Sequence, residues 1–412
     1  MSTGKAIQSA VSSVKTVAYL IDQPLDHRNY DRFGIESWIK RGWVINIFDI
    51  TPISRPAAWQ DFIKRGGVLK ELTYYFPILS FGALISIHKT FRQADYFIDL
   101  TGTSLYSIAI NIAFKFNGTI RIVCALGSIP QFKSNSEQSL RQEIGKLIKG
   151  GFIESSRLIS RRLAGKLLRK LSRYINKPGF GVVSGAESFQ AVQSARKLIY
   201  AHNLDYDIFL RIEHVSNLPQ NKYIVFIDQD NCFHSDFLYS NVVSPVSPET
   251  YFPAVVGVLR KVAESLGTSI RVAAHPRSSY LHSKQDFFDG LPIFYGSTAE
   301  LIRDAEAVVA HDSTALQFAV LFQKPILFVT TDELNALCDG IQSFASELGK
   351  NAINIDRDIS TVDWQMELIV DTKRYADYRR KYIKMDGSSE KPAWDIVIDG
   401  IQCANGNNAV SD

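Results

Sequence analysis

The chain has 412 residues, of which 46% are hydrophobic and 21% charged, so it is globular and long enough for two hydrophobic cores. A formal net charge of +4 is too small to indicate nucleic-acid binding. The four cysteines, Cys124, Cys232, Cys338 and Cys403, lack the short spacings of a zinc knuckle or a disulfide framework. This cysteine usage fits a reducing cytoplasm.

The sequence also argues against a membrane-spanning protein. Residues 1–15 lack the apolar core of a signal peptide, and the longest nearly apolar run, Tyr74–Ile87, has 14 residues. A spanning helix needs about 20. We therefore expect a soluble or peripheral protein in the cytoplasm.

Apolar runs alternate with stretches of helical spacing in the first half of the chain, which predicts a parallel α/β sheet. We assign residues 1–190 to an N-terminal, acceptor-side Rossmann-like domain. One helix is expected at Ser104–Phe116, and the strands are expected at Thr16–Ile21, Trp43–Ile50, Tyr96–Leu100 and Ile120–Leu126.

A basic helical insertion at about 140–175 interrupts this domain. Residues 141–173 carry ten lysines and arginines against two glutamates. Within the insertion, Leu158–Ile175 places leucines at helical spacing with basic residues between them. Two interpretations stay open: the helix contacts an anionic membrane surface, or it packs between domains with a solvated basic face.

A second alternation of strands and helices begins near Leu198 and predicts a C-terminal Rossmann-like domain at 191–360. Residues 361–403 are expected to form helices that pack back on the first domain, including a long helix at Glu367–Met385. Residues 404–412 are expected to be a disordered tail or a linker to further domains. The strands are expected at Tyr223–Ile227, Ser269–Ala273, Pro292–Tyr295, Ala307–Ala310, Pro325–Thr330 and Ala352–Ile355, and the helices at Pro248–Ser265, Thr298–Asp304, Ser313–Phe322 and Asp332–Leu348.

Two Rossmann-like domains facing across a cleft predict the GT-B architecture of glycosyltransferases, with two ligands meeting at the cleft. The sequence contains no GxxxxGK[ST] motif and no well-placed GxGxxG. Their absence argues against a P-loop NTPase and an ordinary dehydrogenase.

Polar side chains follow three predicted strands of the second domain, in Tyr223–Phe237, Val272–Tyr280 and Val308–Leu316. Ligands of parallel sheets bind at the carboxyl ends of strands. His275-Pro276-Arg277 presents an imidazole and a guanidinium, which suit a phosphate or a carboxylate; the alternative is a structural histidine. Lys324 is a second candidate partner for such an anion.

The other strand ends supply further candidates. His311, Ser313 and Thr314 precede a predicted helix, where hydroxyls and free N–H groups bind anions or simply cap the helix. On the acceptor side, we expect contacts from Thr103, Ser184 and Glu187. Either Glu187 or Glu154 is a candidate base for the acceptor hydroxyl. Ordinary capping is the alternative for the loop that holds Thr103.

A His-Pro motif followed further along by a Ser-Thr pair, each after a strand, resembles bacterial transferases that build surface polysaccharides from CMP-activated acid sugars. Four segments together resemble the retaining β-Kdo transferase module of O-antigen enzymes of the WbbB type. They are Ile199–Leu210, Phe226–Phe237, Ala274–Tyr280 and Ala310–Thr331.

The resemblance implies transfer of Kdo from CMP-β-Kdo to a lipid-linked O-antigen chain of lipopolysaccharide, at the inner face of the inner membrane. It implies no metal and no other cofactor, and it places His275, Ser313 and Thr314 at the CMP. Asp228-Gln229-Asp230 formally matches a DxD metal motif, which is the competing interpretation. The alternative functions are a transferase of CMP-sialic acid or CDP-glycerol, and a non-catalytic glycan-binding module.

Retention of configuration requires a nucleophile on the sugar face opposite CMP. In an extended segment, Asp228, Asp230 and residue 232 would line one face, and His234 with Asp236 would assist proton transfer or cap the next turn. The resemblance implies an aspartate at 232, where this chain has Cys232. We interpret Cys232 as a replaced nucleophile that impairs turnover or traps an adduct; the alternative is a small buried cysteine that packs the strand end.

Overall fold

The computed structural model describes residues 14–64, 66, 72–80, 82–83, 93–101, 105–130, 177–213, 221–234, 244, 246–337 and 339–406. The chain divides into two compact units, one of Met1–Val123 with Gly165–Phe180 and one of Cys124–Ala164 with Gly181–Asp412. The predicted basic helix Leu158–Ile175, Thr103, Glu154 and Asp236 lie outside the described residues.

The first sheet has seven strands in the order β3-β2-β1-β4-β5-β6-β7. The pairs that join β3 through β5 are parallel, and their 3-2-1-4-5 order is that of a Rossmann sheet. All six residues of β1 are buried, as expected of a central strand covered on both faces. The strands are β1 (Thr16–Ile21), β2 (Val44–Asp49), β3 (Tyr75–Pro77), β4 (Tyr96–Asp99), β5 (Ile120–Ala125), β6 (Phe180–Val183) and β7 (Lys197–Tyr200).

This sheet extends beyond the sequence prediction at both edges. Strand β3 has three residues and β7 has four, with both end residues of β7 exposed. Strand β3 takes up only three residues of the nearly apolar run Tyr74–Ile87, and β7 contains only three hydrophobic residues, so neither has the length that marks a buried strand. The sheet therefore reaches Tyr200, past the predicted domain boundary at 190.

Helices and aromatic side chains pack around the first sheet. The helix α7 carries Phe114, whose ring stacks on Phe97 of β4 with centroids 4.3 Å apart, and both rings are fully buried. Helix α7 buries one apolar face against the sheet, and the helical spacing of that face is the pattern that predicted it. The helices are α1 (His27–Arg32), α2 (Ile35–Lys40), α3 (Thr51–Ser54), α4 (Pro56–Lys64) and α7 (Leu105–Phe116), and α10 (Phe189–Val192) follows β6.

The second sheet has six strands in the order β10-β9-β8-β11-β12-β13, and every pair is parallel. This is the 3-2-1-4-5-6 order of a Rossmann fold. The predicted α/β class and the two Rossmann-like sheets of a GT-B fold are thus confirmed. The strands are β8 (Tyr223–Ile227), β9 (Ser269–Ala273), β10 (Ile293–Phe294), β11 (Ala307–Ala310), β12 (Ile326–Thr330) and β13 (Ile353–Asn354).

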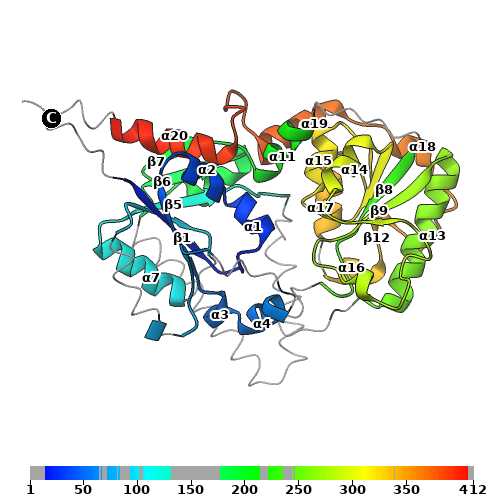
Figure 1. Cartoon of the computed structure of the whole chain (residues 1–412). Coiled ribbons are helices and arrows are strands. Elements are labelled where there is room, and N and C mark those ends of the chain that lie inside the picture. The colour runs from blue at the N-terminus through cyan, green and yellow to red at the C-terminus, as the bar shows by residue number, and fades with distance from the viewer. Residues whose placement is uncertain are drawn as a thin grey trace, which may run out of the picture. The chain divides into compact units, whose positions relative to one another are not determined.

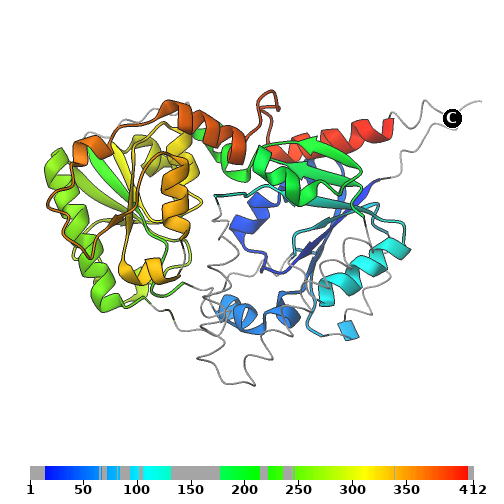
Figure 2. The same cartoon turned by 180° about the vertical axis from the view of Figure 1, so that it is seen from behind.

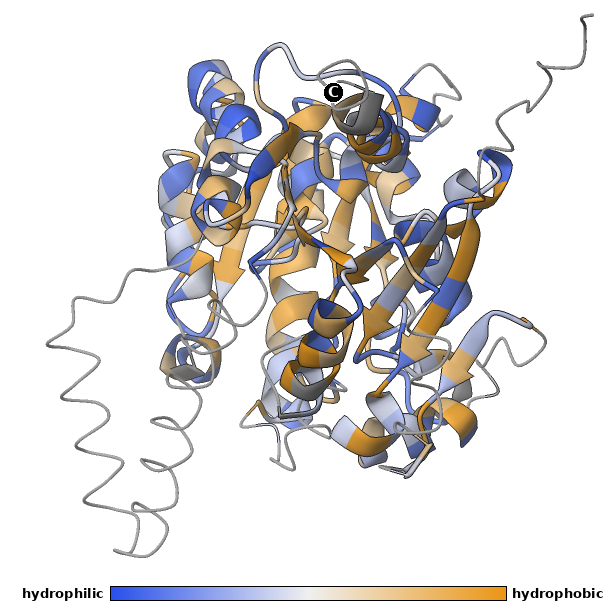
Figure 3. Cartoon of the chain, turned by 90° about the vertical axis from the view of Figure 1, so that its left-hand side faces the viewer, coloured by the Kyte–Doolittle hydropathy of each residue, from blue (hydrophilic) through white to orange (hydrophobic). Residues whose placement is uncertain are grey.

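Helices cover both faces of the second sheet (Figures 1 and 2). On one face α13 packs on β8 and β9 and contacts α18, whereas α14 and α17 pack on the other. The strands are largely hydrophobic between these layers (Figure 3). The helices are α11 (Leu204–Ile212), α13 (Pro248–Leu266), α14 (Thr298–Asp304), α15 (Leu316–Leu321), α16 (Asp332–Leu337), α17 (Gly340–Glu347) and α18 (Trp364–Glu367).

Some helix boundaries differ from the prediction. The predicted helix Asp332–Leu348 is divided into α16 and α17. The predicted helix Glu367–Met385 is replaced by α19 (Thr372–Tyr378) and a π-helical turn (Arg379–Ile383). Asp371 starts α19, because its side chain accepts a hydrogen bond from the Arg374 amide and caps the helix.

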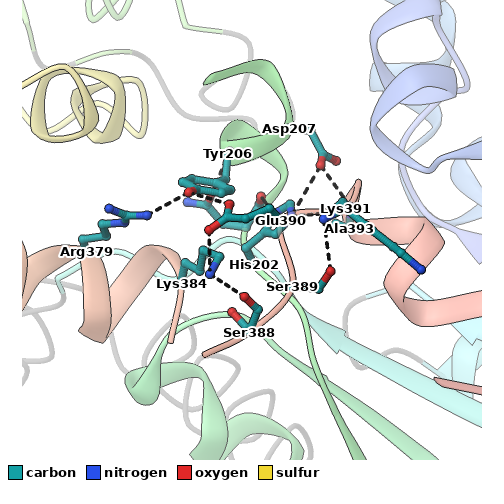
Figure 4. A network of polar contacts seen from close by, with 11 residues as sticks. His202, Tyr206, Asp207, Arg379, Lys384, Ser388, Ser389, Glu390, Lys391 and Ala393 are labelled. Carbon is teal, nitrogen blue, oxygen red and sulfur yellow. Dashed lines mark hydrogen bonds and ion pairs between the residues drawn. The ribbon is translucent and has the colours of Figure 1, made fainter. Parts of the chain in front are cut away.

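A polar network ties the C-terminal segment to α11 (Figure 4). Tyr206 of α11 donates to Glu390 at 2.8 Å and accepts from Arg379 at 2.8 Å. The two ring nitrogens of His202 lie 2.8 Å and 3.0 Å from the carbonyl oxygens of Lys391 and Asn203. These contacts fix the segment that leads into α20 (Ala393–Gly406). Helix α20 then packs against β7.

We predict that His202→Ala destabilises this unit. The substitution removes a fully buried ring that packs on Tyr206 and leaves the Lys391 carbonyl without its partner. We expect a loss of about 2–4 kcal/mol in the free energy of unfolding. Denaturant unfolding followed by circular dichroism measures it.

The matched control is Lys391→Met, which keeps the main-chain carbonyl and removes only a surface ion pair with Asp399. Such pairs contribute less than about 1 kcal/mol. Equal losses in the two variants would contradict the role of His202.

Candidate functional site

Two aspartates lie at the carboxyl end of β8, the central strand of the second sheet. Asp228 is 2% exposed and Asp230 is 4% exposed. Asp228 Oδ1 accepts a hydrogen bond from the Asp230 amide at 3.0 Å, and Asp228 Oδ2 accepts one from the His275 amide at 3.4 Å. The ends of β8 and β9 are therefore joined by this carboxylate, as expected at the ligand edge of a parallel sheet.

The backbone between the two aspartates is not the extended segment that the sequence argument assumed. Asp230 has φ +56°, in the left-handed region, and a turn follows in which the Phe233 amide donates to the Asp230 carbonyl at 2.9 Å. Strict alternation of side chains along 228, 230 and 232 is therefore wrong. Aspartate is one of the few residues other than glycine that visit this region readily.

One hydroxyl brings the two carboxylates together. The Tyr280 hydroxyl lies 3.0 Å from Asp228 Oδ2 and 3.1 Å from Asp230 Oδ1. The ring of Tyr280 is buried against Phe252, Phe287 and Phe288. We call Asp228 and Asp230 the carboxylate pair.

Burial dominates the protonation of Asp228. It raises the pKa of Asp228 to about 6, although hydrogen bonds from the amides of Asp230 and His275 and from Tyr280 lower it. Burial thus disfavours the charged form of Asp228, and the hydrogen-bond donors around it reduce this free-energy penalty.

Cys232 is 6% exposed and lies in the electrostatic field of the pair. Burial first, and then the negative charges of Asp228 and Asp230, raise the pKa of its thiol to about 12. Because the thiolate is the nucleophilic form, this cysteine is almost entirely protonated at neutral pH. The carboxylates next to it oppose its ionisation.

A chain of hydrogen bonds through His311 and Tyr251 holds the loop in which Cys232 lies. His311 Nδ1 donates to the Val329 carbonyl at 2.6 Å, so the neutral ring accepts at Nε2 from the Tyr251 hydroxyl at 2.8 Å. Tyr251 in turn lies 3.3 Å from Asn231 Nδ2. His311 is fully buried, and burial lowers its pKa. It therefore positions the loop, and its predicted contact with the donor gains no support.

The His-Pro-Arg segment lies where the sequence predicted, directly after β9. His275 is half-buried, and its Nδ1 accepts from the Arg277 amide at 3.3 Å. A neutral ring in this arrangement carries its proton on Nε2, which makes that nitrogen a donor. The ring of His234 packs on it with centroids 4.9 Å apart. Pro276 is exposed and Arg277 is half-buried.

The turn after β11 is linked to the turn after β8. Gln229 and Asp312 exchange two hydrogen bonds, from Gln229 Nε2 to Asp312 Oδ1 at 3.1 Å and from the Asp312 amide to Gln229 Oε1 at 3.2 Å. Helix α15 begins at Leu316, and Ser313 Oγ accepts from the Ala315 amide at 3.2 Å. Ser313 is half-buried and Thr314 is exposed at this edge.

Lys324 does not belong to this edge. It lies between α15 and β12, at the amino end of the strand, whereas the other candidates follow carboxyl ends. Its neighbouring charges are Glu306 and Asp304, and burial lowers its pKa. The predicted donor contact of Lys324 is contradicted because the chain direction of a parallel sheet puts it at the opposite edge.

The candidate acceptor residues have different environments. Ser184 is fully buried, and its hydroxyl donates to the Ala125 carbonyl at 2.9 Å, which is a structural contact. Glu187 is exposed and lines a cavity of about 1220 Å³ in the second unit. The wall also includes Gln190, Gln342, Lys381 and Tyr382.

The metal interpretation gains no support from the described residues. Among them, no group of three or more histidine, cysteine, aspartate or glutamate side chains is arranged to hold a metal ion. In the same part of the chain, no helix is long and apolar enough to cross a membrane.

Comparisons with known proteins show similarity at the level of the fold. No family model matches the chain, and no curated protein matches its sequence. Three of the similar solved structures are MurG of Acinetobacter baumannii, the UDP-GlcNAc 2-epimerase of Methanocaldococcus jannaschii with UDP-GlcNAc and UDP, and the calicheamicin glycosyltransferase CalG4. In that order, they are 10%, 13% and 13% identical to this chain, with TM-scores of 0.45, 0.47 and 0.45. The matches cover 94%, 94% and 97% of this chain. They cover 99%, 99% and 100% of the matched chains. Identities this low carry no information about the substrate.

We predict that Asp228 makes stability depend on pH. Its pKa is raised above that of an unfolded aspartate, so the folded state binds more protons between about pH 4 and pH 6. Stability therefore falls as the pH rises through this window, by about 3 kcal/mol from this group. Asp228→Asn should flatten the fall, as measured by unfolding midpoints at several pH values. A curve that keeps its full slope in Asp228→Asn would contradict the assignment.

Proposed function

We propose that the chain is a retaining glycosyltransferase that moves Kdo from CMP-β-Kdo to a lipid-linked O-antigen glycan through an adduct on residue 232. The observation that carries the proposal is the grouping of the carboxylate pair and Cys232 after β8, next to His275 after β9. The resemblance of these same segments to β-Kdo transferases supports the choice of donor.

The negative charge of the carboxylate pair would repel this donor unless cationic side chains also contact it. The phosphate and the sugar carboxylate of CMP-Kdo are both anionic, and the carboxylate pair repels them. His275 Nε2 and the Arg277 guanidinium, both after β9, are the groups we assign to these anions. Ser313 and Thr314 are assigned to the phosphate and ribose, because hydroxyls at this edge can donate to them.

The reaction has two displacements. In the first, the side chain of residue 232 attacks the anomeric carbon, and the bonding electrons leave with CMP. In the second, the acceptor oxygen attacks the same carbon, residue 232 leaves with its electron pair, and the acceptor proton passes to a carboxylate. Cys232 impairs both steps, since its thiol is scarcely ionised and a thioglycoside leaves poorly.

The first test is intact-mass measurement after incubation with CMP-Kdo. We expect this chain to gain the mass of one Kdo slowly, faster at higher pH because the thiolate fraction rises. Peptide mapping should place the gain at Cys232, and Cys232→Asp should turn over instead. The control is Cys403→Ser, which removes an exposed thiol and should leave the adduct unchanged. Full transfer activity without any gain at Cys232 would overturn the nucleophile assignment.

Donor competition separates the alternative transferases. In the Cys232→Asp form, we expect CMP-Kdo to be consumed and CMP-sialic acid and CDP-glycerol to be left. Preference for one of the latter would reassign the donor. A form that uses none of the three and still binds glycan would favour the glycan-binding module.

We further propose that the transfer needs no metal. EDTA should leave the rate of the Cys232→Asp form unchanged, whereas a metal bound at Asp228-Gln229-Asp230 would make the rate fall on chelation and recover with added divalent cation. Initial rates with and without EDTA decide between these outcomes.

A further inference from the structure

The hydroxyl of Tyr280 is the donor common to both members of the carboxylate pair. It lies at nearly equal distances from them, 3.0 Å to Asp228 and 3.1 Å to Asp230. The single proton of the hydroxyl can be shared between the two carboxylate oxygens, and the hydroxyl holds both oxygens against one point. The aromatic packing of the ring fixes that point.

We propose that Tyr280 is a positioning residue that keeps the carboxylate pair ionised beside residue 232. Two like charges in a buried site repel each other, and the pair would otherwise take up a proton. An ionised pair can accept the proton that an acceptor hydroxyl releases. The role of the pair as a proton acceptor rests on the proposed function, whereas the control of its charge by Tyr280 does not.

Other titratable groups surround the site. Tyr251 and Glu249 of α13 and Glu333 of α16 act on the pair or on Cys232 through space, and the ring of His234 packs on His275. From the end of β9, His275 contributes its backbone amide. At the end of β11, Asp312 is held by Gln229. Among the contacts described, Tyr280 is the side chain that touches both carboxylates.

The direction of the effect follows from the contacts. The Tyr280 hydroxyl lowers the pKa of Asp228, so Tyr280→Phe raises it and leaves the pair protonated at higher pH. With one negative charge removed, the pKa of the Cys232 thiol falls, because the charges of Asp228 and Asp230 help to raise it. The thiol of the variant therefore becomes more reactive near neutral pH.

The experiment measures the rate at which iodoacetamide alkylates Cys232 between pH 5 and pH 10, site by site, by peptide mass spectrometry. We expect Tyr280→Phe to react roughly threefold to tenfold faster than the parent in a window that begins near pH 6. The ratio should return towards one at high pH, where the pair is ionised in both proteins. Wider access to the cysteine would instead raise the rate equally at every pH, and that result would overturn the proposal.

Two further variants make the test specific. Tyr223→Phe removes a buried hydroxyl that donates to the Leu301 carbonyl at 2.9 Å, away from the pair, and should show no such window. In a background with both Asp228→Asn and Asp230→Asn the charges of the pair are absent, so Tyr280→Phe should add no window. A window in Tyr223→Phe, or one that survives the double substitution, would contradict the assignment.

If iodoacetamide alkylates Cys232 too slowly to be measured, the pH dependence of stability tests the proposal instead. The stability of the parent should fall with pH only up to about pH 6, whereas the fall in Tyr280→Phe should extend to higher pH. Identical curves would overturn the proposal. These readouts need no sugar donor, so a protein that shows the window but never uses CMP-Kdo refutes only the proposed function.

Discussion

The burial of two carboxylates at the end of β8 is the constraint on which the candidate site depends. A charged carboxylate in an apolar core is unfavourable unless donors surround it. Here the donors come from several elements: the Asp230 amide, the His275 amide after β9 and the Tyr280 hydroxyl. The positions of these elements are therefore linked to the charge of the pair.

The same logic explains the relay through His311. A histidine at a strand end suggests a ligand contact, but full burial makes its two nitrogens find partners within the protein. The Val329 carbonyl accepts a hydrogen bond from Nδ1, and the Tyr251 hydroxyl donates one to Nε2. The relay thereby fixes Asn231, next to Cys232 in the chain. Buried and half-buried polar residues at one sheet edge thus divide into those that hold the loops and those, such as His275, that can face a ligand.

The sequence predicted the sheets well because buried parallel strands are continuous apolar runs. It found β8 to β13 within two residues, but it missed β3 and β7, which are short and partly exposed. It put Asp228, Cys232 and His275 in one region, and in the structure the His275 amide lies 3.4 Å from Asp228 Oδ2. It could not find Tyr280 or Tyr251, since an isolated tyrosine in a loop or a helix gives no signal until the fold brings its hydroxyl to a carboxylate or an imidazole. It also assigned Lys324 to the donor, although the predicted strand Pro325–Thr330 already put this residue at the amino end of a strand.

The electrostatics at residue 232 bear on which nucleophile suits the site. A thiol must lose a proton to react, and burial and the negative charge of the pair both oppose that loss. A carboxyl group has an ordinary pKa about five units lower than a thiol. The same environment can raise it and still leave a useful fraction ionised at neutral pH. The pair opposes ionisation of either side chain at 232, but a larger fraction of an aspartate than of a cysteine would be ionised at neutral pH. The surroundings of Cys232 therefore oppose a thiolate, which is the form that the proposed displacement would need.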